Sequence, residues 1–277
     1  MAAQREREAE SGTAGASGNA GGAGADSTRR FSDRVEHYVK YRPGYPLEVI
    51  GFLRERGVLT AASIVADVGS GTGISADLFL REGNTVYGVE PNAEMRGAAE
   101  KLLARRFPRF RSVNGTAEAT TLPTESIDIV VAAQAFHWFD LDKAREEFRR
   151  ILRLGGRAVL LWNTRKTAGS LFLEAYEQLL NEYGTDYRRV RHDNASQERV
   201  ASFFGHERFE TARFPNEQAF DLAGLEGRLL SSSYAPAPGH PRHEPMLRSL
   251  RRIFHEFAES GRVRFLYDTE VYAGGFD

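Results

Sequence analysis

The fold class can be predicted from the segment Ser63–Gly73, which reads SIVADVGSGTG. Its first six residues are mostly apolar and include β-branched side chains, which predicts a short buried strand. Glycines at positions 69, 71 and 73 then let the backbone turn sharply and let a ligand approach the main chain closely. An amphipathic helix is expected over 74–81, and the N–H groups of its first turn have no partner within the helix. A strand, a glycine-rich turn and a helix in this order open a doubly wound α/β fold.

The alternation of strand and helix continues along the chain. Further strands are expected over 85–90, 109–113, 127–133, 157–162, 207–214 and 262–273, and further helices over 47–57, 93–106, 141–153, 170–183, 222–231 and 244–259. Short apolar runs separated by amphipathic helices indicate a parallel sheet that is covered on both faces. The predicted fold class is therefore α/β, with a doubly wound, mostly parallel, seven-stranded sheet.

The first 30 residues differ in composition from the rest of the 277-residue chain. They contain no Leu, Ile, Val, Phe, Tyr or Trp, so they cannot bury enough apolar surface to offset the entropy of an ordered chain. We expect residues 1–30 to be a disordered tail, and they lack the apolar centre of a secretory signal. Residues 31–277 are expected to form one domain, which begins with an amphipathic helix at Phe31.

Composition excludes several classes of protein. The formal net charge is −1, which does not fit a protein that binds nucleic acid along a basic surface. There is no cysteine, so disulfides, thiolate metal sites and cysteine nucleophiles are excluded, and no metal site is expected. No apolar run approaches the roughly 18–20 residues that cross a bilayer. We expect a cytoplasmic protein that binds neither nucleic acid nor membrane and is a monomer or weak dimer.

An acidic residue stands where a nucleotide-binding fold would use it. Glu90 ends the second expected strand, next to the glycine turn in a doubly wound sheet, where a carboxylate can accept the two hydroxyls of a ribose. The glycine spacing is G-x-G-x-G, whereas dinucleotide sites have G-x-G-x-x-G and would place their third glycine at Ile74. This spacing disfavours an NAD-type oxidoreductase. The plainer interpretation is a tight turn beside a solvated Glu90.

Several motifs resemble one known family. Val65–Gly73 looks like motif I, and Val86–Pro91 like motif II, of the class I S-adenosylmethionine-dependent methyltransferases. The resemblance continues through Gly115–Glu118 with Leu122-Pro123, Ile127–Val130 followed by Ala135–Phe139, and Leu154–Gly156. These matches cover residues 60–165 and imply the methyltransferase form of the Rossmann-like fold, with S-adenosylmethionine as cofactor.

Other motifs resemble one subgroup of that family. The sequence YRPGYP at 41–46, HWFD at 137–140 and LWN at 161–163 look like the type 11 methyltransferases, which include trans-aconitate-like enzymes that act on small molecules. The C-terminal segments 231–234 and 267–272 look like the same subgroup. The resemblance implies lid helices over 31–60, a cofactor-binding core over 61–165, and an acceptor cap with C-terminal strands over 166–277.

The resemblance also implies which residues hold the cofactor. The glycine turn would cradle it, Glu90 would hold its ribose, and the segment near residue 117 would flank adenine. The implied cofactor-binding residues are Asp67, Gly69, Ser70, Gly71, Gly73, Glu90, Pro91, Asn92, Met95, Ala117, Glu118 and Gln134.

The candidate acceptor residues each have two interpretations. His137 follows the fourth strand and could act as a general base near neutral pH, or it could only shape the pocket. Trp138 and Trp162 could face the sulfonium or the acceptor through a cation–π contact, or they could be core residues. Tyr38, Tyr41 and Arg42 could form a lid, or their segment could only cover the sheet.

Taken together, these resemblances imply methyl transfer from S-adenosylmethionine to a small-molecule acceptor. The cluster Arg188–His192 could select an anionic metabolite, or it could be a solvated loop. Two alternatives stay open at this point: an NAD-type oxidoreductase, and a non-catalytic module that binds the cofactor without an acceptor.

Overall fold

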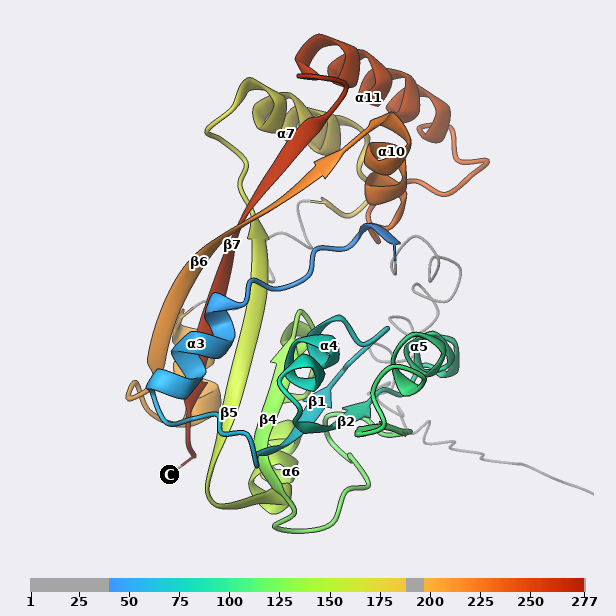
Figure 1. Cartoon of the computed structure of the whole chain (residues 1–277). Coiled ribbons are helices and arrows are strands. Elements are labelled where there is room, and N and C mark those ends of the chain that lie inside the picture. Colours follow the sequence, from blue (N-terminus) through green and yellow to red (C-terminus); the bar gives the residue numbers. More distant parts are fainter. Residues whose placement is uncertain (1–39, 188–196, 277) are drawn as a thin grey trace, which may run out of the picture.

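The computed structural model describes residues 40–187 and 197–276 (Figure 1). The expected tail over 1–30, the expected helix at Phe31, Tyr38 and the cluster Arg188–His192 lie outside these residues. Within the part that the structure describes, no helix combines the length and the apolar composition that crossing a membrane requires.

A seven-stranded sheet runs through the described part of the chain, in the order β3-β2-β1-β4-β5-β7-β6. The strands are β1 (Ile64–Val68), β2 (Thr85–Val89), β3 (Phe110–Val113), β4 (Ile127–Ala133), β5 (Leu152–Arg165), β6 (Glu210–Phe220) and β7 (Val263–Gly274). The first five are mutually parallel, and β7 pairs antiparallel with both β5 and β6. The predicted fold class is confirmed.

The helices connect the strands and cover the sheet. They are α3 (Glu48–Glu55), α4 (Ile74–Arg81), α5 (Ala93–Ala99), α6 (Leu141–Ile151), α7 (Leu171–Tyr183), α9 (Gln197–Phe204), α10 (Leu222–Leu230) and α11 (His243–Phe257), with a π-helical turn at Glu100–Ala104 and a 3₁₀ turn at Phe136–Trp138. Helix α9 was not predicted, although Val200, Phe203 and Phe204 show the spacing of one buried helix face.

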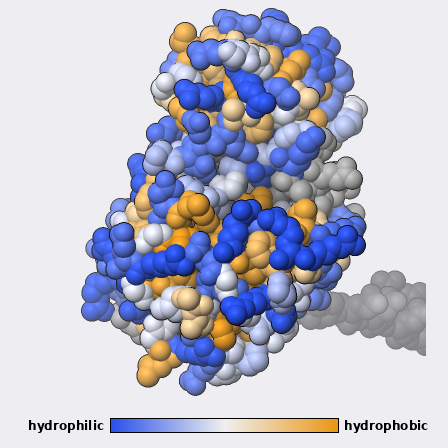
Figure 2. Space-filling model, viewed as in Figure 1, coloured by the Kyte–Doolittle hydropathy of each residue, from blue (hydrophilic) through white to orange (hydrophobic). Residues whose placement is uncertain are grey.

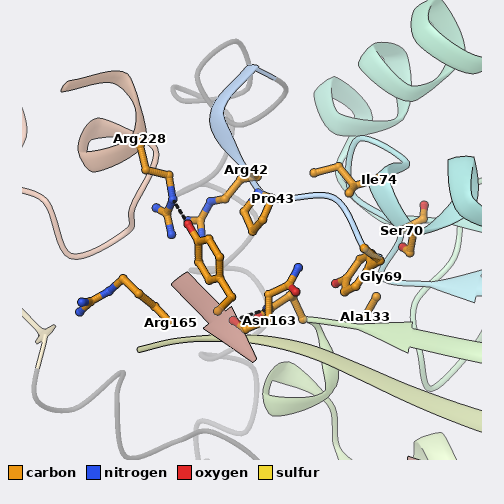
Figure 3. A pocket seen from close by; sticks show the side chains of 13 residues that line it. Arg42, Pro43, Gly69, Ser70, Ile74, Ala133, Asn163, Arg165 and Arg228 are labelled. Atoms are coloured by element: carbon orange, nitrogen blue, oxygen red, sulfur yellow. Dashed lines mark hydrogen bonds between the residues drawn. The ribbon is translucent and has the colours of Figure 1, made fainter. Parts of the chain in front are cut away.

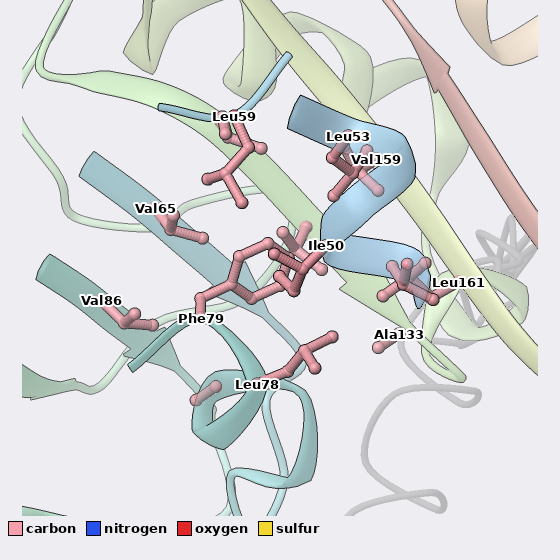
Figure 4. Packing of buried hydrophobic residues seen from close by; sticks show 14 of the residues in the cluster. Ile50, Leu53, Leu59, Val65, Leu78, Phe79, Val86, Ala133, Val159 and Leu161 are labelled. Atoms are coloured by element: carbon pink, nitrogen blue, oxygen red, sulfur yellow. The ribbon is translucent and has the colours of Figure 1, made fainter. Parts of the chain in front are cut away.

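Apolar clusters lie on both faces of the sheet. On one face, Leu53 of α3 and Phe79 of α4 pack with strand residues such as Val65 (Figure 4). On the other face, Phe148 of α6 and Phe203 of α9 pack with residues that include Trp162 of β5. Because both faces are buried, the strands are apolar almost throughout, as the sequence indicates.

Three strands extend beyond this core. β5 runs to Arg165 rather than 162, and β6 covers 210–220 rather than 207–214. Helices α7, α10 and α11 pack on the extended ends of β6 and β7 around a third buried cluster, which includes Phe265 and Tyr267. We call this part the cap. It forms the upper lobe of the molecule, above the lobe that holds the parallel sheet (Figures 1 and 2).

A short extended segment crosses between the cap and the core (Figure 1). We call residues 41–46 the strap. The carbonyl oxygen of Gly44 accepts hydrogen bonds from the side-chain amides of Asn163 (3.0 Å) and Asn216 (2.8 Å). The Gln218 amide donates to the Tyr41 carbonyl at 3.3 Å. Strands β5 and β6 therefore hold the strap in place through side-chain amides.

Candidate functional site

The glycine turn follows β1 at the carboxyl edge of the sheet. Gly69, Gly71 and Gly73 have φ angles of 68°, 55° and 86°, a left-handed conformation that favours glycine. The Gly69 and Ser70 amides donate to the Val89 carbonyl, at 2.8 and 3.1 Å, which fixes the turn beside the end of β2. A Cβ atom on Gly71 would meet no protein atom within 4 Å. The turn therefore presents open backbone to a ligand.

Glu90 lies directly against this turn. Its Oε2 accepts a hydrogen bond from the Gly71 amide at 3.0 Å, and its Oε1 accepts one from the Asn92 amide at 2.9 Å. Burial raises the pKa of Glu90, and the two backbone hydrogen bonds partly oppose that increase. A carboxylate offers about four acceptor positions, so Glu90 can still receive the two hydroxyls of a ribose.

Asp67 lies beneath the turn and is completely buried. Its Oδ2 accepts a hydrogen bond from the Ser75 hydroxyl at 2.7 Å, while its Oδ1 has no hydrogen-bond partner among residues 40–187 and 197–276. Burial raises the pKa of Asp67 to about 7, and the nearby Glu90 contributes in the same direction. A buried carboxyl group with an unused oxygen beside open backbone fits a polar ligand at this edge.

Other residues from the expected cofactor set surround the same edge. Asn92 caps α5, because its Oδ1 accepts from the amides of Glu94 (2.9 Å) and Met95 (3.0 Å). Pro91 is exposed, whereas Met95 and Ala117 are buried. Glu118 accepts a hydrogen bond from the Asp140 amide at 3.0 Å.

A pocket of about 80 Å³ opens from the glycine turn toward the cap (Figure 3). The core contributes Gly69, Ser70, Ile74, Ser75, Ala133 and Gln134, the strap contributes Arg42, Pro43 and Tyr45, and the long strands and the cap contribute Asn163, Arg165, Tyr267 and Arg228. Gln134 has φ 58°, and its side-chain amide donates to the Asn163 carbonyl at 3.0 Å. Non-glycine residues rarely adopt this conformation, and functional sites are enriched in it.

The expected acceptor residues are not all brought together. Arg42 lines the pocket, together with Gln134 of the expected cofactor set. The Tyr41 ring packs against Gly227 of α10. His137 and Trp138 lie in the 3₁₀ turn after β4, with their ring centres 4.6 Å apart, and are not among the residues that line this pocket. Trp162 is only 4% exposed and packs against Phe136 and Tyr272 on the other face of the sheet.

Nine of the thirteen pocket residues were not predicted as site residues from the sequence, and they include Asn163, Arg165, Arg228 and Tyr267. One signal for two of them was present in β5. Side chains alternate between the two faces of a strand, so Trp162 and Asn163 must point to opposite faces. With Trp162 in the core of one face, Asn163 and Arg165 face the pocket.

Comparison with known proteins identifies the core. Residues 66–160 match the family model of a methyltransferase domain. A protein assigned as an S-adenosylmethionine-dependent methyltransferase in Saccharomyces cerevisiae is 32% identical over 123 residues, which is 43% of this chain and 42% of that protein. Residues 66–160 of this chain therefore correspond to a methyltransferase domain.

Two further comparisons cover longer parts of the chain. An uncharacterized methyltransferase of Mycobacterium tuberculosis is 39% identical over 140 residues, which is 50% of this chain and 54% of that protein. The chain thus spans about half the length of such curated relatives. The structure of a protein assigned as a type II methyltransferase from Anaeromyxobacter dehalogenans has a TM-score of 0.63 and 24% identity, over 85% of this chain and 98% of that chain. The structural likeness shows that the fold extends through the C-terminal strands.

Proposed function

We propose that the whole chain transfers a methyl group from S-adenosylmethionine to a small-molecule acceptor. The observation that supports this most directly is the shared pocket, because the glycine turn, Gln134, the strap and the cap all line it. A cofactor held by the turn would therefore meet an acceptor that the cap encloses.

Each residue of the turn has a definite task in this proposal. The Gly69–Gly73 backbone gives the cofactor close approach, Glu90 holds the ribose hydroxyls, and Asp67 supplies a buried oxygen below the turn. Ala117 and Glu118 flank the adenine, and Asn92 and Met95 form the start of α5 next to the adenine. When bound, the cofactor supplies an activated methyl group, so the chain mainly orients the reactants. Such positioning contributes roughly 7–11 kcal/mol to lowering a barrier.

Two roles of His137 follow from its place after β4. It either removes a proton from the acceptor or shapes the pocket wall when the cofactor is bound. We propose the second role as the starting hypothesis, because His137 lies in the turn that follows the lining residues Ala133 and Gln134, while its own side chain is not part of the lining.

We further propose the type 11 small-molecule subgroup and an anionic acceptor. The strap sequence YRPGYP supports the subgroup, and the guanidinium groups in the pocket wall support the anionic acceptor. The expected single domain, the monomeric or weakly dimeric state and the cytoplasmic location stay predictions from the sequence.

Calorimetry with S-adenosylhomocysteine and with NAD tests the cofactor. We expect S-adenosylhomocysteine to bind with a micromolar Kd and NAD not to bind. Labelled S-adenosylmethionine, mixed with cell extract and followed by mass spectrometry of the products, then tests the activity. Binding without any labelled product would favour the non-catalytic module, and binding of NAD alone would overturn the proposal.

A further inference from the structure

Arg228 is a buried cation in the wall of the pocket. It lies on α10, is 5% exposed and lines the pocket together with Gly69 and Ser70 of the glycine turn. Its Nε donates to the Tyr267 hydroxyl at 3.3 Å, and its Nη1 donates to the Ser232 hydroxyl at 3.0 Å. Within residues 40–187 and 197–276, the ion pairs of the structure include none between Arg228 and a carboxylate. Burying a guanidinium without a counter-charge is unfavourable.

The other two arginines of the pocket differ from Arg228. Arg165 pairs with Glu177, with Nη2 and Oε2 2.5 Å apart, and its guanidinium points away from the other two (Figure 3). Arg42, on the strap, donates to the carbonyl oxygen of Ser231 at 2.9 Å, one turn along the chain from Arg228. Two guanidinium groups thus lie close together at the cap end of the pocket, one carried by the strap and one by α10.

The donors of Arg228 leave room for a ligand. A guanidinium has five N–H donors, and the bonds to Tyr267 and Ser232 use two of them. The Tyr267 hydroxyl in turn donates to Gln218 Oε1 at 3.0 Å, so Tyr267 fixes the direction of the Arg228 side chain. The remaining donors match the planar, bidentate geometry by which arginine binds a carboxylate.

We infer that Arg228, with Arg42 opposite it, binds a carboxylate of the acceptor and so selects carboxylic acids as substrates. This inference rests on the proposed methyl transfer. The bound carboxylate is an anchor and not the reacting group, because the glycine turn, where the methyl donor binds, lies at the other end of the pocket. Pairing with a guanidinium would also reduce the nucleophilicity of a carboxylate.

The test measures binding to the protein saturated with S-adenosylhomocysteine. The probes are C4–C6 mono- and dicarboxylates, their methyl esters and inorganic phosphate, each followed by calorimetry. We expect at least one carboxylate to bind and its ester to bind at least 30-fold more weakly. Arg228→Met should lose at least 30-fold in affinity for that carboxylate, and Arg228→Lys should retain part of it. Arg248→Gln, which removes an exposed positive charge from α11, should bind like the wild type.

The thermal midpoint of the ligand-free protein separates binding from a purely structural role. The methionine side chain is similar in length to that of arginine and carries no charge. In the variant, the Tyr267 hydroxyl keeps its hydrogen bond to Gln218. We therefore expect the midpoint of Arg228→Met to equal or exceed that of the wild type, with unchanged affinity for S-adenosylhomocysteine. A midpoint several degrees lower, or binding of phosphate but of no carboxylate, would overturn the inference.

The two proposals fail in different ways. If the wild type does not bind S-adenosylhomocysteine, the proposed function is wrong. If it binds S-adenosylhomocysteine but no carboxylate of the panel, the proposed function stands and the assignment of Arg228 is wrong.

Discussion

The buried carboxyl group of Asp67 makes the stability of the folded protein depend on pH. Burial raises its pKa from 3.8 to about 7, so at intermediate pH the folded protein holds a proton that the unfolded chain has released. This contribution to stability is fully present below pH 3.8 and is lost as the pH rises through about 7. A shift of this size corresponds to about 4 kcal/mol, at 1.36 kcal/mol per unit.

We predict that Asp67→Asn removes this pH dependence. The free energy of unfolding of the variant, relative to that of the wild type, should rise by up to about 4 kcal/mol between pH 4 and pH 8. Denaturant titrations of both proteins at a series of pH values measure it. Ser75→Ala removes a hydrogen bond that lowers the pKa of Asp67, so the pKa of Asp67 should rise further in this variant. The loss of folding stability with increasing pH should then continue to a higher pH than in the wild type. A constant difference between Asp67→Asn and wild type across this range would contradict the prediction.

A second residue-scale prediction concerns Gly71. Replacing it with Ala forces a Cβ into a left-handed conformation, which costs roughly 1–2 kcal/mol, and places a methyl group in the open space that we propose for the cofactor. We expect affinity for S-adenosylhomocysteine to fall at least tenfold. Gly155→Ala is the matched control, since Gly155 has φ 80° and equally open surroundings but lies at the opposite edge of the sheet. The Gly155→Ala variant should lose a similar amount of folding stability and keep the wild-type affinity for S-adenosylhomocysteine.

For single residues, the sequence predicts the proposed cofactor-binding edge better than the pocket wall proposed for the acceptor. The turn and Glu90 are close in sequence and lie where a parallel sheet must bring them together, so their spacing alone places them. Arg228 meets Arg42 only because α10 packs over the strap, more than 180 residues away. Periodicity within one segment carries no information about such a contact.

The strap is the element that closes the pocket. Asn216 donates to the Gly44 carbonyl at 2.8 Å and to Asn163 Oδ1 at 3.0 Å. Each such bond contributes about 1 kcal/mol, or roughly a fivefold change in an opening equilibrium. We predict that Asn216→Ala raises the hydrogen-exchange rate of the strap amides about five- to tenfold.

Peptide-level mass spectrometry over 41–46 measures this exchange. Asn181→Ala is the control, because among residues 40–187 and 197–276 the Asn181 amide donates to Glu177 within α7. If exchange in Asn216→Ala equals that of the wild type, packing of Tyr41 on Gly227 holds the strap instead.

The ends of the long strands were the least predictable elements. β6 contains Pro215, which a central strand could not accommodate, so a sequence pattern favours ending the strand before it. The strand continues because β6 lies at the edge of the sheet, where the missing N–H of proline costs no pairing. The polar end of β5 continues for a similar reason, since residues 158–165 pair along their whole length with β7.

For the whole molecule, β7 connects the two lobes. Its C-terminal half pairs with β5 beside the parallel sheet, while Val263 and Phe265 near its start belong to the buried cluster of the cap. A strand shared in this way couples the folding of both lobes. We therefore predict that the cap and the core unfold in one transition, as a single domain would.

Phe265→Ala tests this coupling. Phe265 is fully buried, and removal of such a ring costs about 3–5 kcal/mol, which lowers the Tm of a domain of this size by roughly 6–20 °C.

Both tryptophans of the chain, Trp138 and Trp162, lie in the core lobe, so their fluorescence reports on the core alone. We expect the fluorescence midpoint to fall together with the midpoint from far-UV circular dichroism. Phe79→Ala, in the core, should lower both in the same way. If the fluorescence midpoint of Phe265→Ala matched the wild type while circular dichroism showed an earlier step, the cap would fold as a separate unit, and α10 could carry Arg228 away from the glycine turn without unfolding the core.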